Sequence, residues 1–85
     1  MSEELKPISP ERAAQELAKV CAAHKAGELK NNEYEHKFAR MVGELRDRRI
    51  SGSRAEIMAA LEPLRIEGKV TPAEMHRFVS QLGLS

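Results

Sequence analysis

Two side chains with metal-binding and nucleophilic chemistry, Cys21 and His24, stand three residues apart. At this spacing they would lie on the same face of a helix. A thiolate and an imidazole can bind zinc together, or act as a nucleophile and its base. A structural zinc site needs four ligands, however, and only His36 and His76 could join them. Because the rest of that face is apolar, we interpret Cys21 as a small core residue beside a boundary histidine.

Glu33 and His36 have the Glu-x-x-His spacing that helical di-iron proteins use. Such a site needs a second pair, and the segment Glu74-Met75-His76 has the wrong spacing for one. Glu33 also has a simpler explanation, because a carboxylate near a helix start is favoured by the helix dipole. We therefore expect no metal site, no cofactor and no catalytic residues, and we predict that the protein is not an enzyme.

Arginines concentrated in the middle of the chain are the best candidate for a contact surface. Residues 37–54 carry six basic and two acidic side chains, although the net charge of the whole chain is only +1. A guanidinium group suits carboxylates and phosphates, because its planar fork donates two parallel hydrogen bonds. The residues predicted to bind a partner are Arg40, Arg46, Arg48, Arg49 and Arg54.

Residues 46–54, the arginine-rich junction, leave three interpretations open. The arginines could bind an acidic protein surface, grip nucleic-acid phosphates, or only complement the dipole at a helix end. No aromatic residues alternate with them to stack on bases, and the pI of about 7.9 is low for a nucleic-acid module. We predict a non-enzymatic protein-binding module, acting as an adaptor, regulator or inhibitor of a partner with an acidic surface. Nucleic-acid binding is the alternative.

Apolar residues at helical spacing predict four helices that position these groups. The first spans about 10–26 and the second about 31–49. The third begins after Ser53 and closes at Gly68, with a kink or break near Glu62 caused by Pro63. The fourth begins after Thr71 and ends at Gly83. No segment alternates with period two, so we predict no strand. The residues expected in the core or in a self-association surface are Leu17, Val20, Tyr34, Phe38, Met41, Leu45, Ile57, Leu61, Met75, Phe78, Val79 and Leu82.

The chain repeats a helix–turn–helix pattern after 41 residues. Each copy has a glycine that can close a helix, an aliphatic residue two positions on, a glutamate six on and a large apolar residue seven on. These are Gly27, Leu29, Glu33, Tyr34 in the first copy and Gly68, Val70, Glu74, Met75 in the second. Short turns join antiparallel helices. We therefore predict an all-α fold in which two short helical hairpins, residues 9–50 and 53–85, pack as one small bundle. Residues 1–8 would form a flexible tail before this single domain, residues 9–85.

This unit resembles the short C-terminal helical domain called SHOCT, found at the ends of many bacterial proteins. The family pattern is a helix with spaced leucines, then roughly Gly-x-Ile-Thr-x-x-Glu-Phe-x-x-Lys and a final Leu pair. Besides the positions above, Lys37 and Met41-Val42 match in the first copy, and Thr71 matches in the second. Lys30 replaces the family's Thr in the first copy, and Phe78 replaces its Lys in the second. The resemblance implies oligomerisation and protein contacts without catalysis.

The composition limits the core that this chain can build. Leu, Ile, Val and Phe make up 18 of the 85 residues, close to the level of about 20% below which chains tend toward disorder. We therefore expect self-association, in a homodimer or larger assembly, to complete the bundle. Neither a signal peptide nor an apolar run long enough for a membrane span is present, and the single cysteine suits a reducing compartment. These features predict a cytoplasmic protein with no membrane contact.

Overall fold

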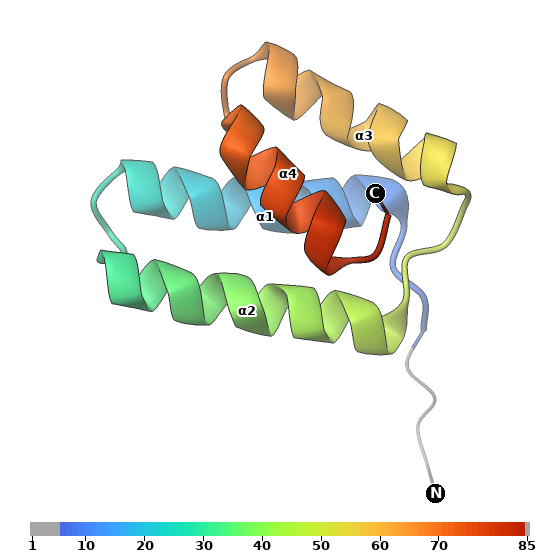
Figure 1. The fold of residues 1–85 in the computed structure, drawn as a ribbon, viewed down its shortest axis with the longest axis horizontal. Helices are drawn as coiled ribbons and strands as arrows, with labels where there is room; N and C mark the ends of the chain where they lie inside the picture. The colour runs from blue at the N-terminus through green and yellow to red at the C-terminus, as the bar shows by residue number, and fades with distance from the viewer. Residues whose placement is uncertain (1–5, 85) are drawn as a thin grey trace, which may run out of the picture.

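The computed structural model describes residues 6–84 and contains four helices (Figure 1). They are α1 (Pro10–Lys25), α2 (Asn31–Arg48), α3 (Arg54–Ile66) and α4 (Pro72–Gln81). Within residues 6–84 no strand forms, and the only extended pairing is an isolated parallel bridge between Ile8 and Ile50. The predicted all-α class and its four helices are therefore confirmed.

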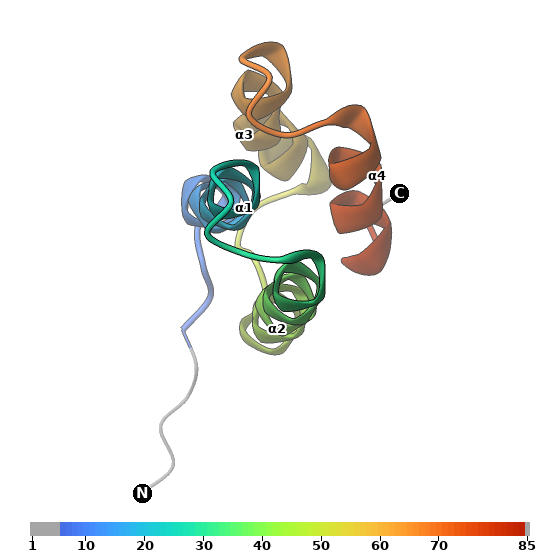
Figure 2. The same ribbon diagram turned by 90° about the vertical axis from the view of Figure 1, so that its left-hand side faces the viewer.

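Helix α1 lies between α2 and α3 on one side of the bundle, and α4 packs across the opposite side (Figures 1 and 2). The backbone contact between helices is most extensive between α1 and α3 and between α1 and α2. Ala13 and Ala14 on α1 are buried, and small side chains at a contact reduce the distance between helix axes. The buried alanines of α1 thus allow this helix to pack closely against both α2 and α3.

Both hairpin turns have the same backbone geometry. Gly27 has a φ of +80° and Gly68 a φ of +73°, in the left-handed region that glycine adopts at low cost. In each turn the residue after the glycine donates its N–H to the carbonyl five positions back, as in a Schellman cap. These hydrogen bonds run from Glu28 to Ala23 and from Lys69 to Leu64, each at 2.9 Å. The repeat in the sequence is therefore a repeat of a helix cap.

A glutamate caps the second helix of each hairpin. The carboxylate of Glu33 accepts the N–H of Lys30, and that of Glu74 accepts the N–H of Thr71, both at 2.9 Å. The Thr71 hydroxyl accepts the N–H of Glu74 in return at 3.1 Å, which completes a capping box. A lysine side chain has no acceptor, so the start of α2 keeps only half of this arrangement.

Side chains from all four helices meet in one core. Phe38 and Phe78 are fully buried and lie edge to face, with ring centroids 6.3 Å apart. The predicted core residues are all buried except Val20 and Leu82, which are half-buried and pack against the core. Among residues 6–84, Ile66 is the only large hydrophobic residue that is exposed, at 70%. The apolar stripes therefore face one another within a single chain, and self-association stays a prediction.

Two residues affect the regularity of the helices, Pro63 in α3 and Gly43 in α2. Helix α3 continues through Pro63 to Ile66, so the helix is not broken near Glu62. Pro63 lies in the last turn of α3, and its ring is exposed to solvent. Because proline has no N–H, the helix loses one backbone hydrogen bond at this position. In α2, a Cβ added to Gly43 would meet no atom within 4 Å. No neighbour requires a glycine there, so Gly43 is a weak point of the helix.

Ile8 was predicted to be part of a flexible tail, but it belongs to the folded domain. Its side chain is 5% exposed. Its N–H donates to the carbonyl of Arg49 at 2.9 Å, and its carbonyl accepts the N–H of Ser51 at 2.8 Å. Residues 1–5, the remainder of the expected tail, lie outside the described residues. A single isoleucine between proline and serine has no periodic neighbours, so the sequence pattern did not reveal this contact.

Candidate functional site

The arginine-rich junction contains an unusual backbone conformation. Helix α2 ends at Arg48, and the next residue, Arg49, has φ 68° and ψ 149°. Among residues 6–84 it is the only non-glycine residue with a positive φ. Such a conformation costs about 1–3 kcal/mol and persists only where the surroundings impose it. Here the hydrogen bond from Ile8 to the Arg49 carbonyl holds the turn in place.

A hollow of about 240 Å³ lies beside this turn. Its lining combines five aliphatic side chains with two arginines: Leu45, Ile50, Ile57, Leu82 and Leu84, and Arg46 and Arg49. Leu45 and Ile57 are buried, whereas Arg46 and Arg49 are exposed. The hollow therefore has an apolar floor and a cationic rim. Arg46 lies in the last turn of α2 and Arg49 directly follows the helix, and both side chains line the hollow.

Arg54 adds a third cation beside this hollow. Its Nε donates a hydrogen bond to the carbonyl oxygen of Leu84, and Leu84 lines the hollow. This contact ties the start of α3 to the end of the described chain. Arg46 and Arg49 therefore line the hollow, and Arg54 contacts the backbone of one residue in its lining.

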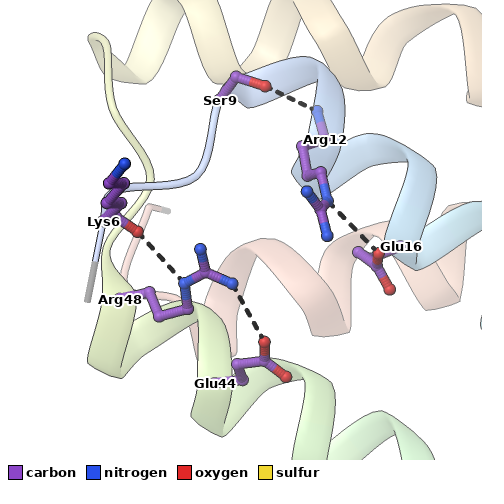
Figure 3. A network of polar contacts seen from close by, with 6 residues as sticks. All are labelled: Lys6, Ser9, Arg12, Glu16, Glu44 and Arg48. Carbon is purple, nitrogen blue, oxygen red and sulfur yellow. Dashed lines mark hydrogen bonds and ion pairs between the residues drawn. The ribbon is translucent and has the colours of Figure 1, made fainter. Parts of the chain in front are cut away.

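The other two arginines in the predicted set lie elsewhere. Arg48 donates from Nε to the carbonyl of Lys6 at 3.2 Å and pairs with Glu44 at 3.5 Å (Figure 3). Arg40 lines a separate hollow together with Glu44, Asp47 and Arg48, where acidic and basic groups are mixed. In Figure 3, Arg12 near the start of α1 likewise pairs with a carboxylate, that of Glu16. The five predicted arginines thus divide into two that line the apolar hollow, Arg46 and Arg49, one that contacts a lining residue, Arg54, and two on a mixed surface, Arg40 and Arg48.

The three arginines around the apolar hollow are not neutralised by carboxylates. Within residues 6–84, Arg46, Arg49 and Arg54 form no ion pair, whereas Arg48 and Arg77 each have a glutamate partner. No carboxylate lines the hollow in this part of the chain either. The arrangement therefore places positive charge directly beside the half-buried side chains of Ile50, Leu82 and Leu84, which raises the local attraction for anionic groups.

A second group of polar side chains lies at the opposite end of α2. The Tyr34 hydroxyl donates to Oε2 of Glu74 on α4 at 2.9 Å. The ring of His24 stacks on Tyr34, with centroids 4.1 Å apart, and its Nε2 lies 3.0 Å from Oδ1 of Asn31. These contacts join α1, α2 and α4. We interpret them as structural, because each polar group has a partner inside the bundle.

Cys21 does not have the properties of a nucleophile. Burial raises the pKa of its thiol to about 12, and the nearby carboxylate of Glu74 adds to this effect. A thiol with so high a pKa contains almost no thiolate at neutral pH, and the thiolate is the reactive form. Within residues 6–84, no three His, Cys, Asp or Glu side chains gather where they could hold a metal ion. His24 stacks on Tyr34 instead of joining Cys21 in a site.

Sequence reasoning did not include two residues that form this hollow, Ile50 and Leu84. Both are isolated aliphatic residues in polar, irregular segments, so neither belongs to a periodic stripe. The division of the arginines did have a signal in the sequence. Arg40, Glu44 and Arg48 follow one another at intervals of four and share a helix face, which separates them from Arg46 and Arg49.

Comparisons with protein families, with curated proteins and with solved structures find no match for this chain. The likeness to the SHOCT domain therefore rests on the sequence pattern alone. In residues 6–84, no helix combines the length and the apolar character needed to cross a membrane.

Proposed function

We propose that this protein is a non-enzymatic protein-binding module that contacts its partner through the arginine-rich junction. One observation supports the proposal: within residues 6–84, Arg46 and Arg49 form no ion pair, and the apolar hollow that they line has no carboxylate in its lining. At protein interfaces, a few residues in well-packed pockets contribute most of the binding energy, and arginine is among the residue types enriched there. The module would act as an adaptor, regulator or inhibitor of a partner with an acidic surface.

The alternative, nucleic-acid binding through the same arginines, has less support. Phosphate contacts need cations, and an apolar floor adds nothing to them. Stacking on bases needs accessible aromatic rings. The sequence has one Tyr and two Phe, and Tyr34, Phe38 and Phe78 are all buried. The apolar floor therefore favours a protein partner over a phosphate backbone.

Affinity capture from the native host tests this proposal. The bait is the full chain, compared with the double variant Arg46→Glu/Arg49→Glu, both with and without nuclease. The matched control is Lys19→Glu/Lys37→Glu, which makes the same change in net charge at two exposed positions on α1 and α2. We expect a protein that survives nuclease treatment, is retained by the control and is lost from the arginine variant. Capture that disappears with nuclease would support the nucleic-acid alternative instead.

Two further parts of the proposal concern the state of the protein in the cell. The SHOCT resemblance implies self-association, and a concentration series in sedimentation velocity measures it directly. A stable monomer across the series would remove that part. A cytoplasmic location is supported by the single buried thiol, which needs neither a disulfide partner nor an oxidising compartment.

A further inference from the structure

We infer that the hollow at the arginine-rich junction accepts a short acidic segment of a partner protein, with one large apolar anchor side chain flanked by carboxylates. The inference rests on the proposed function, and it specifies the chemistry of the partner. It follows from the size of the hollow, the charge around it and the way in which its rim is fixed.

The size of the hollow sets the size of the group that fills it. Its volume of about 240 Å³ is below the roughly 300–1,000 Å³ that small-molecule and cofactor sites usually have. A space of this size suits one large side chain from an otherwise exposed segment. Because the floor consists of aliphatic groups from α2, α3 and the end of the chain, an aliphatic or aromatic anchor would gain most from burial there.

The charge around the hollow sets the residues beside the anchor. Arg46 and Arg49 lie at the end of α2, and Arg54 approaches from α3 through its bond to Leu84. Arg46 and Arg49 therefore supply the charge in the lining, and Arg54 adds a cation next to one of its residues. Carboxylates on both sides of the anchor would each reach a guanidinium group, and the planar fork favours two-bond contacts with carboxylates.

The rim is held in position before any partner arrives. The Arg49 backbone is fixed by the bond from Ile8, and the Arg54 guanidinium is oriented by the Leu84 carbonyl. Groups that are already ordered lose less conformational entropy on binding. The backbone at Arg49 is therefore already in place at the rim, held in its strained conformation by Ile8.

Another hollow in the described chain has a similar composition but different electrostatics. It is lined by Ala18, Ala22, Gln15, Lys19 and Lys69. Lys69 forms an ion pair with Glu67 at 3.1 Å, so part of its charge is neutralised. Lysine also lacks the planar fork that matches a carboxylate. The arginine-bordered hollow is therefore the better site for an acidic segment.

Selection from a displayed library of random linear peptides, with the folded full chain as bait, tests this inference. We expect enriched peptides to carry net negative charge and one large apolar residue between acidic residues. Synthetic copies should bind Arg46→Glu/Arg49→Glu about tenfold or more weakly than wild type, a difference of about 1.4 kcal/mol. They should bind Lys19→Glu/Lys37→Glu as they bind wild type.

A floor variant, Leu84→Ser, tests the apolar half of the inference separately. Leu84 is half-buried at the chain end, and circular dichroism checks that the variant is folded. We expect this variant to bind peptides that carry the apolar anchor more weakly than wild type does. Peptides whose anchor is replaced by alanine should bind the variant and wild type equally well.

The possible results separate the inference from the proposed function. Enriched peptides that lack the acidic, anchored pattern but still lose affinity for the arginine variant would contradict the inference and leave the junction as the binding site. Peptides that bind the arginine variant as they bind wild type would contradict both. A selection that enriches no peptide would contradict the inference.

Discussion

The backbone N–H of Ile8 donates a 2.9 Å hydrogen bond to the carbonyl oxygen of Arg49. This bond joins the segment before α1 to the strained residue after α2. Ile8 also places its side chain in the core. One residue thus fills the base of the bundle and fixes the backbone of an arginine at the rim of the candidate site.

Replacement of Ile8 with alanine should destabilise the whole domain. Deleting most of a buried isoleucine side chain costs about 2–5 kcal/mol through lost burial and the cavity that remains, and Ile8 is among the buried core residues. Urea denaturation followed by circular dichroism measures the change. Lys6→Ala is the matched control in the same segment. Lys6 contacts Arg48 through its backbone carbonyl, which the alanine variant keeps. A variant Ile8→Ala as stable as Lys6→Ala would show that the segment is not part of the core.

Arg49→Gly should stabilise the protein while it weakens partner binding. Glycine adopts the positive φ of 68° at this position with little strain, so we expect a gain of about 1 kcal/mol. For a domain of this size that corresponds to a rise of roughly 4–8 °C in Tm. Arg46→Gly, inside the last turn of α2, should instead cost about 1 kcal/mol. Thermal unfolding of the two variants compares them, and a shift in the same direction for both would contradict the account of Arg49.

Replacement of glycine with alanine should change stability in opposite directions at the two hairpin turns and in the middle of α2. Gly27→Ala and Gly68→Ala place a Cβ at φ values of +80° and +73°, and each should cost about 1 kcal/mol. Gly43→Ala, where the added Cβ meets no atom within 4 Å, should instead stabilise the protein by about 0.5–1 kcal/mol. Chemical denaturation measures all three. Stabilisation by Gly68→Ala would be incompatible with the observed cap.

The bond between Tyr34 and Glu74 should make stability depend on pH. Burial acts to raise the pKa of Glu74, but hydrogen bonds from the backbone N–H of Thr71 and from the Tyr34 hydroxyl outweigh it and hold the pKa below its usual range. Because the folded pKa is lower than the unfolded one, the stabilisation is fully present above the unfolded pKa. It is lost as the pH falls through the folded pKa.

Tyr34→Phe removes one of these hydrogen bonds and should lower the free energy of unfolding by about 1.5 kcal/mol at neutral pH. The difference from wild type should shrink in acid, where Glu74 becomes protonated and the bond is no longer charge-assisted. Denaturation at a series of pH values measures both effects. A difference that stays constant from neutral to acidic pH would mean that Glu74 is not the group responsible.

Much of the fold follows from local patterns in the sequence. Helix bounds were predictable because caps such as Thr71 with Glu74, and closing glycines such as Gly68, act within a few residues. Core positions were predictable because Phe38 and Leu45 fall on a helical stripe. The position of Ile8 was not predictable, because its partners in the bundle lie more than 40 residues away in sequence.

The candidate site was predictable only in part. The concentration of arginines indicated the junction, but the apolar floor depends on Ile50 and Leu84, which tertiary packing alone brings together. In addition, not every arginine in this segment is unpaired, since Arg48 forms an ion pair with Glu44 and donates a hydrogen bond to the Lys6 carbonyl. Charge counts along a sequence cannot distinguish a paired arginine from an unpaired one.

The most direct test of the binding account is an isothermal titration of the captured partner into three folded proteins: wild type, Arg46→Glu/Arg49→Glu and Lys19→Glu/Lys37→Glu. We expect the arginine variant to bind at least about tenfold more weakly than wild type, and the lysine variant to bind equally well. Equal affinity for all three proteins would contradict a role for the junction in binding.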